Sequence, residues 1–291
     1  MIESPFKQVD VFTSIPFNGN PVAVIMDASE LTSEQMQKIA NWTNLSETTF
    51  VLPANDSQAD YRVRIFTPES ELPFAGHPTI GTAFALLESG IIDAKDGNLI
   101  QECQAGLINL SVETDDAGKY SISFELPKPL INNLDLTQVE ELEGILNCQL
   151  DRTLTPAIID VGPRWIVAHA GDADKVLAAK PDFAQLAEYS NKLNATGVCL
   201  YGYWSSSPNK HIEVRAFAPA CGVNEDPVCG SGNGSVASFM RHHGLILAEE
   251  KLKSTQGKAL GRNGHINIQF SQGKILVGGN AVTCVEGKIR L

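Results

Sequence analysis

The feature that most constrains the fold of this chain is an internal repeat, in which one strand–turn–helix motif occurs twice. In the first copy, Val63–Gly90, a strand-like run ends at Thr67-Pro68, an acidic loop follows, and Pro78 is placed to begin a helix. Gly90 provides the helix stop. The apolar residues of this helix recur at the i, i+3, i+4, i+7 spacing of one helix face: Ile80, Ala83, Phe84 and Leu87.

The second copy is Val214–Gly244, which is three residues longer than the first. Its strand, Val214–Pro219, leads through GVNEDPVCGSGNG to a helix whose apolar face includes Val236 and Phe239. A repeat of this length that occurs only twice indicates a duplicated domain and not a solenoid.

Elements on both sides of the motif repeat in the same order, at an offset near 151 residues. Each copy is predicted to begin with two strands, continue with an amphipathic helix and add a further strand. In the first copy these are Gln8–Thr13, a hairpin turn at Asn18-Gly19, Val22–Ile25, a helix capped by Ser33 and running to about Asn44, and Leu45–Leu52. In the second copy they are Ala157–Val161, a turn at Gly162-Pro163, Trp165–Ala168, Asp182–Asn194 and Gly197–Tyr203.

These patterns predict two pseudo-symmetric α+β domains, each with mixed strands around a central helix, that face each other across a cleft. The boundary falls at Leu126–Pro129, because two prolines in four residues favour an extended connector. The N-terminal domain is therefore predicted to comprise residues 1–127 and the C-terminal domain residues 128–278.

Composition limits the classes of partner. The chain of 291 residues is 43% hydrophobic and 19% charged, which is typical of a soluble globular protein. Its formal charge of −12 disfavours nucleic acid, because that binding depends on Lys and Arg neutralising phosphates. No apolar run reaches the roughly 20 residues needed to span a membrane, and the N-terminus has no export signal. Six cysteines without a CxxC pair favour reduced thiols, so we expect a cytoplasmic protein.

Facing copies would bring two helix N-termini to one cleft, each approached by a glycine turn: Ala75-Gly76-His77 and Cys229–Gly232. Exposed backbone N–H groups at such ends bind carboxylates and phosphates. The alternative is that these glycines only permit a tight strand-to-helix turn. Two matched copies favour a ligand site, and we expect the two turns to share one anion.

The positions where the copies differ carry the chemistry. Glu47 is matched by Thr196, His77 by Ser231, and Asp226 by Leu72. Moving a proton within a substrate requires a base and an acid, which these residues can supply. Each also has a structural alternative: an edge-strand glutamate, a helix-capping histidine, or an aspartate that closes a turn before proline.

Several motifs, in order along nearly the whole chain, resemble those of the PhzF-like (phenazine biosynthesis) isomerases, which are similar in fold to diaminopimelate epimerase. The motifs are Asn18-Gly19-Asn20-Pro21, Leu45-Ser46-Glu47-Thr48, Phe66-Thr67-Pro68, Ala75-Gly76-His77-Pro78-Thr79 and Glu225-Asp226-Pro227-Val228-Cys229-Gly230-Ser231.

The resemblance implies two barrel-like sheets, each around a helix, with a C-terminal strand at about 279–291 returning to the first domain. It implies a cofactor-free isomerase that moves a proton within a small carboxylate-bearing substrate, with Glu47 as general acid/base assisted by His77 and Asp226. It also implies a homodimer. The substrate-binding residues that it implies are Asn20, Gly76, Cys229, Gly230, Ser231 and Gly232, and it does not identify the substrate or the pathway.

One departure bears on the reaction type. Racemases related to diaminopimelate epimerase use a cysteine in each copy, whereas this chain has Ala75 opposite Cys229, which disfavours a two-thiol reaction. A one-base epimerase or racemase, and a non-catalytic small-carboxylate-binding protein, stay open.

Nicotinamide binding at Gly230–Gly234 is a minor alternative, because the sixth-position glycine of the dinucleotide motif is missing. No metal site is expected, because the histidines are scattered.

Overall fold

The computed structural model describes residues 3–206 and 210–290. Contacts between Cα atoms divide the chain into two compact units. Unit 1 comprises the chain up to Phe124 together with the segment from Gly278 onward, and unit 2 is Glu125–Val277. The mixture of strands and few helices confirms the predicted α+β class.

Unit 1 is a closed barrel of eight strands. Its pairings run β1–β2–β3–β4–β6–β7–β8–β17 and return to β1, with β2–β3 and β4–β6 parallel and the other pairs with a defined register antiparallel. Closure leaves no unpaired edge in the ring. The strands are β1 (Glu3–Val11), β2 (Asn20–Ile25), β3 (Thr48–Leu52), β4 (Tyr61–Phe66), β6 (Asn98–Cys103), β7 (Gly106–Thr114), β8 (Tyr120–Glu125) and β17 (Lys274–Arg290), with a short β5 (Glu71–Leu72) beside β4.

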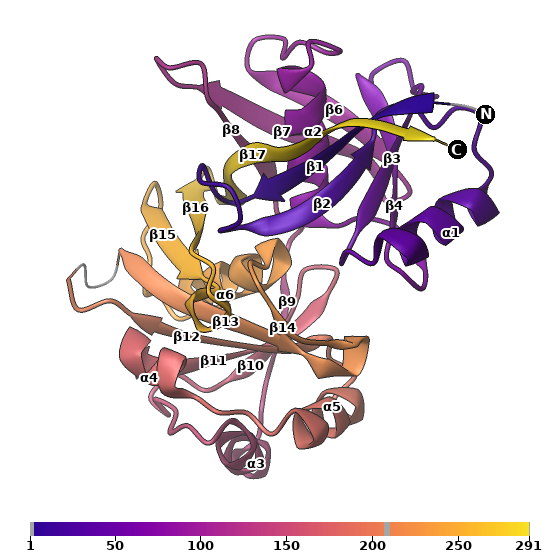
Figure 1. The fold of residues 1–291 in the computed structure, drawn as a ribbon. Helices are drawn as coiled ribbons and strands as arrows, with labels where there is room; N and C mark the ends of the chain where they lie inside the picture. Colours follow the sequence, from indigo (N-terminus) through magenta and orange to yellow (C-terminus); the bar gives the residue numbers. More distant parts are fainter. Residues whose placement is uncertain (1–2, 207–209, 291) are drawn as a thin grey trace. The chain divides into compact units, whose positions relative to one another are not determined.

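Helix α2 (Gly76–Glu88) lies among these strands, and every residue from Gly76 to Leu87 is buried (Figure 1). A helix that is apolar on all sides belongs in a core. Gly81 allows α2 to pack closely against β2, because a Cβ there would lie 2.4 Å from Val22 Cγ1. The helix begins two residues before Pro78, whose missing N–H is not needed in a first turn, and Gly90 ends it in the left-handed region.

Helix α1 (Ser33–Thr43) covers the outer face of the barrel through Met36 and Ala40, which pack on Phe50 and Phe66. The prediction of Ser33 as its N-cap was wrong. Thr32 is the N-cap, and it forms a reciprocal capping box with Gln35 that satisfies two backbone donors.

The prediction of a tight hairpin turn at Asn18-Gly19 was also wrong. Strands β1 and β2 do form an antiparallel hairpin, but the whole segment 12–19 joins them. Gly19 is needed for close packing and not for a tight turn, because a Cβ there would lie 2.1 Å from Val11 O. The Gly19 N–H donates to the buried Asp10 carboxylate at 2.9 Å.

Unit 2 contains a sheet in the order β9–β10–β11–β12–β13–β15–β16, with β14 paired to β13. Its parallel pairs, β11–β12 and β13–β15, match the two parallel pairs of unit 1. The strands are β9 (Leu130–Asn133), β10 (Ala157–Asp160), β11 (Arg164–Asp172), β12 (Gly197–Tyr203), β13 (His211–Ala218), β14 (Val223–Asp226), β15 (Lys251–Gln256) and β16 (Gly264–Ser271).

Helix α6 (Gly230–His242) is the counterpart of α2 and is buried over most of its length. One core cluster of unit 2 packs α3 and α5 against the sheet through residues such as Leu142, Leu186, Leu200 and Phe217. The remaining helices are α3 (Leu136–Leu146), α4 (Ala173–Ala178) and α5 (Phe183–Lys192), with 3₁₀ turns η1 (Pro219–Cys221) and η2 (Lys258–Leu260).

The duplication extends to paired charges. In unit 1 the Arg64 guanidinium binds Glu71 at 2.6 Å and lies 5.0 Å from the centre of the Phe66 ring. In unit 2 Arg215 binds Glu225 at 2.8 Å and lies 4.8 Å from the Phe217 ring. The same charge pair and ring contact therefore join the same two strands in both copies.

Candidate active site

The first group of predicted site residues lies at one end of the unit 1 barrel. Glu47 directly precedes β3, and His77 lies in the first turn of α2. Glu47 Oε2 is 3.3 Å from His77 Nε2, and the two side chains are 16% and 7% exposed. The structure therefore brings together a carboxylate and an imidazole that are 30 residues apart in the chain.

Hydroxyl groups fix β3 against α2 beneath this pair. The Thr82 hydroxyl of α2 lies 2.9 Å from the Thr49 hydroxyl of β3, and both side chains are fully buried. Thr48 is bonded in turn to Thr43 at 2.7 Å. Because the Thr82–Thr49 bond joins the helix that carries His77 to the strand that Glu47 precedes, it limits how far the pair can separate.

Burial raises the pKa of Glu47 to about 7, and a hydrogen bond from Ser46 opposes this shift. Desolvation disfavours the charged form of a carboxyl group, which explains the direction. A carboxyl group with a pKa near neutrality exists in both protonation states near neutral pH, as a general acid/base requires.

Two further predicted residues lie in unit 1. Asn20 begins β2 and is 1% exposed. Gly76 is the first residue of α2, and a Cβ there would lie 2.7 Å from the Phe124 ring, so a larger residue would displace this ring or the helix end. Gly76 is thus required for packing, whether or not it also binds a ligand.

The second group lies in unit 2, at the loop between β14 and α6. The Asp226 carboxylate accepts a hydrogen bond from Val228 N at 3.0 Å, which closes the turn through Pro227. The Asp226 carbonyl accepts a bond from the side chain of Gln256 at 2.8 Å. Asp226 as a whole is only partly buried.

Cys229 is the N-cap of α6, at the position that Ala75 occupies in α2. Its sulfur accepts a bond from Gly232 N at 3.3 Å. Burial, with the nearby Asp226 and Cys199, raises the pKa of the Cys229 thiol well above its ordinary value. The thiol therefore stays protonated and is a poor nucleophile or base.

Ser231 lies in the first turn of α6. The Trp165 indole N–H of β11 donates to Ser231 Oγ at 3.0 Å. An indole can only donate, so the serine hydrogen is left for another acceptor, and the Cys229 sulfur lies within reach at 3.5 Å from Ser231 Oγ. Gly230 is the first residue of the helix, and a Cβ at Gly232 would lie 2.8 Å from the Cys199 sulfur, so this glycine too is required for packing.

Comparison with known proteins identifies the family to which this chain belongs. The model of the phenazine biosynthesis-like family, PhzC-PhzF, matches residues 9–287. This chain belongs to the PhzF family.

Two relatives match over nearly the whole of both chains. The chain is 42% identical to "Antisense-enhancing sequence 1" of Schizosaccharomyces pombe, over 99% of both chains. It is 34% identical to trans-2,3-dihydro-3-hydroxyanthranilate isomerase of Pseudomonas fluorescens, over 97% of this chain and 98% of that protein. On these relationships the chain is an isomerase.

Solved structures support the same family and fold. A PhzF-family phenazine biosynthesis protein of Bacillus anthracis aligns over 100% of both chains with a TM-score of 0.88 and 26% identity. A probable proline racemase of Agrobacterium radiobacter K84 aligns over 99% of this chain and 93% of that chain, with a TM-score of 0.68 and 15% identity. The second likeness shows the fold alone, and it confirms the predicted relation to the epimerase fold.

Sequence reasoning missed three residues that support this candidate site: Thr82, Trp165 and Gln256. All three are buried or nearly so, and each contacts a predicted site residue or its supporting strand. Their partners lie 27–66 positions away in the chain, so spacing gave no signal for them. The glycines at 232 and 234 face Cys199 and Leu126, which argues against a nicotinamide-binding loop there.

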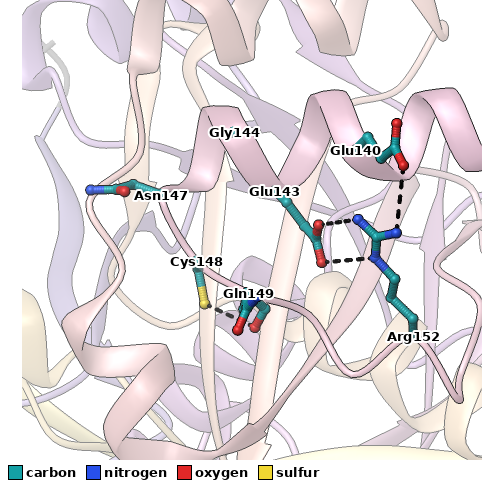
Figure 2. Close-up of a pocket in the computed structure, with 7 residues that line it drawn as sticks. All are labelled: Glu140, Glu143, Gly144, Asn147, Cys148, Gln149 and Arg152. Atoms are coloured by element: carbon teal, nitrogen blue, oxygen red, sulfur yellow. Dashed lines mark hydrogen bonds and ion pairs between the residues drawn. The ribbon is translucent and has the colours of Figure 1, made fainter.

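A depression of about 460 Å³ in unit 2 is separate from all of the predicted site residues (Figure 2). It is formed by the C-terminal part of α3 and the loop after it. Glu143 binds Arg152 at 2.5 Å, with Glu140 3.6 Å from the same guanidinium. The cation is therefore already neutralised, and the depression offers little to a charged ligand.

In residues 3–206 and 210–290, no helix is long and apolar enough to cross a membrane. The same described residues contain no group of three or more His, Cys, Asp or Glu arranged to hold a metal ion.

Proposed function

We propose that the chain catalyses a cofactor-independent isomerisation that moves a proton within a small carboxylate-bearing substrate, with Glu47 as the general acid/base. The observation that carries this proposal is the Glu47–His77 pair, with its 3.3 Å separation and a carboxyl pKa of about 7.

In the proposed reaction the Glu47 carboxylate removes a proton from a carbon atom of the substrate. The electrons of the broken C–H bond enter the π system of the substrate, and the carboxylic acid then returns the proton to a different atom. Substrate and product have the same composition and oxidation level, so no co-reactant is consumed. His77 Nε2 can donate a hydrogen bond to the charged form of Glu47 or accept one from the neutral form, according to its tautomer.

In this proposal the substrate carboxylate is bound by the Ser231 hydroxyl and by backbone N–H groups at the start of a helix. The bond from Trp165 supports this role, because it leaves the serine hydrogen to be donated. Asn20, Gly76, Cys229, Gly230 and Gly232 contribute surface to the substrate, and Asp226 assists the proton transfer. These roles, like homodimer formation, rest on the family resemblance.

The first substrate to test is trans-2,3-dihydro-3-hydroxyanthranilate, the compound named for relatives of 34% and 33% identity. Purified protein treated with a chelator and dialysed should convert it, or a related small carboxylate, to a positional isomer detectable by proton NMR. A product that differs only in configuration would indicate an epimerase instead. Binding of such carboxylates without any conversion would indicate a non-catalytic binding protein.

A further inference from the structure

Gln256, at the end of β15, is fully buried and joins three parts of the loop that leads into α6. Its amide oxygen accepts bonds from Cys229 N at 3.1 Å and from the Asn233 side chain at 2.7 Å. Its amide nitrogen donates to the Asp226 carbonyl at 2.8 Å. One side chain therefore fixes both ends of the segment Asp226–Cys229.

Two neighbouring glycines, Gly257 and Gly264, allow the backbone to pack closely against the loop that Gln256 bonds. Gly257 has φ +97°, and a Cβ there would lie 2.6 Å from the carbonyl oxygen of Pro227. On the next strand, a Cβ at Gly264 would lie 2.3 Å from a methyl carbon of Val228. Two glycines thus let β15 and β16 press against the same loop that Gln256 bonds.

Among the described residues of the first copy, no side chain makes a clamp of this kind, and the loop before α2 is instead bonded by backbone, from Ala105 N to the Pro73 carbonyl at 3.1 Å. Tyr61 pairs with Gln101 in parallel register, and at the offset of the repeat the matching pair is Ile212 with Ser254. Both strand residues bond the central helix: Gln101 donates to Thr79 at 3.0 Å, and Ser254 donates to Asn233 at 2.5 Å. Two residues further on, Gln256 therefore corresponds to Cys103.

The Cys103 thiol bonds the nearby Gly106 carbonyl at 3.5 Å and takes no part in a clamp on the helix entry. The copies thus share the bond to the helix and differ in how the loop is held, by one backbone bond in the first copy and by the Gln256 side chain in the second. The side-chain clamp occurs in the copy that carries Asp226.

We infer that Gln256 is a positioning residue, which holds the Asp226 backbone and the Cys229 amide in the arrangement needed for substrate binding and proton transfer. This inference rests on the proposed function. The Cys229 amide and the Asn233 side chain are buried, so loss of their acceptor leaves buried donors unsatisfied. Freed of the clamp, the loop would sample positions in which Asp226 and the first N–H groups of α6 no longer converge.

The decisive variants are Gln256→Met, which removes all three bonds at similar volume, and Gln256→Glu, which is isosteric. Ser254→Ala is the matched control, because Ser254 is buried on the same strand and bonds the same Asn233 but does not contact the loop. We expect hydrogen–deuterium exchange at the Cys229 amide to accelerate about tenfold or more in Gln256→Met. It should stay near the wild-type rate in Ser254→Ala.

Gln256→Glu provides a second test, because a residue with a purely structural role would not make the relative kcat/KM depend on pH. The protonated carboxyl can still donate to the Asp226 carbonyl, whereas the carboxylate cannot. We therefore expect the kcat/KM of this variant, divided by that of the wild type, to lie within a factor of about three of unity at about pH 6. The same ratio should fall about tenfold at about pH 9.

The exchange measurement needs no substrate, so it tests the clamp even if the wild type isomerises nothing, an outcome that would count against the proposed function alone. The inference is overturned if folded Gln256→Met matches Ser254→Ala in Cys229 exchange. It is equally overturned if the kcat/KM ratio of Gln256→Glu does not change with pH.

Discussion

At Glu47 burial favours the protonated carboxyl group, and the hydrogen bond from Ser46 favours the charged form. The unfolded carboxyl group ionises near 4.5 and the folded one near 7. Between these values the folded chain binds a proton that the unfolded chain does not, so the free energy of unfolding falls as pH rises. Above pH 7 the folded protein carries a desolvated carboxylate, a cost of about 3 kcal/mol at most by the size of the shift.

Glu47→Gln should therefore stabilise the protein in a pH-dependent way. Near pH 8 we expect its free energy of unfolding to exceed that of the wild type by about 1–3 kcal/mol, because the amide carries no charge. Near pH 4.5, where the wild-type carboxyl group is largely protonated in the folded state, the difference should largely vanish. Urea denaturation at the two pH values measures this, and a gain that is equal at both would show that burial does not control the ionisation of Glu47.

Cys229 should be dispensable for chemistry. Its raised pKa keeps it a neutral thiol, and Ala75 occupies the same N-cap position in the other copy. We expect Cys229→Ala to retain kcat within about threefold, with a cost of about 1 kcal/mol or less for the weak sulfur cap. Near-total loss of turnover in a folded variant would contradict this and indicate thiol chemistry.

At the scale of elements, the two central helices depend on close packing more than on helix propensity. Gly81→Ala improves propensity by roughly 1 kcal/mol but places a Cβ 2.4 Å from Val22. We expect a net loss of about 1–3 kcal/mol from overpacking. Gly144→Ala on α3 is the control, because a Cβ there meets nothing within 4 Å, and it should be neutral or stabilising by about 0.5–1 kcal/mol.

Thermal or urea denaturation of both variants tests this account of the barrel. If Gly81→Ala proved as stable as Gly144→Ala, the fit of α2 against β2 would be looser than the structure indicates.

Elements with strong local patterns were predictable. The strand Gly197–Tyr203 was predicted with its observed bounds. The helices α2 and α6 were found because apolar periodicity and a glycine stop agree there, α1 from its amphipathic pattern, and α5 because it repeats α1 at the offset of the duplication. Helix α3 and strand β17 were not predicted from periodicity. The long β17 contains Gly278, Gly279 and Gly287, which lower strand propensity, and its pairing with β1 depends on residues at the other end of the chain.

The candidate site was predictable where the two copies differ. Comparing them drew attention to Glu47, His77 and Asp226, and the structure places the first two 3.3 Å apart. The comparison could not reveal Gln256, because its role appears only in contacts across 23–30 positions of chain. The capping threonine Thr32 was missed for a local reason, since Ser33 beside it is an equally good cap by residue type.

For the whole molecule, one duplicated architecture carries two different sets of polar residues. Both units keep the Arg–Glu pair over a phenylalanine and the buried bond from a strand to the central helix. The Glu47–His77 pair occurs in unit 1, where unit 2 has Thr196 and Ser231. Thr196 instead bonds the Arg164 backbone, which is a structural role.

The measurement that tests the central claim most directly is isomerisation in heavy water, with the wild type and Glu47→Gln compared under identical conditions. Glutamine keeps nearly the same shape but cannot transfer a proton. We expect the variant to bind substrate with a similar affinity and to lose roughly 10²–10⁴-fold in kcat. Deuterium incorporation into substrate and product should fall in parallel. Incorporation that continued at the wild-type rate in the variant would show that a different residue is the base.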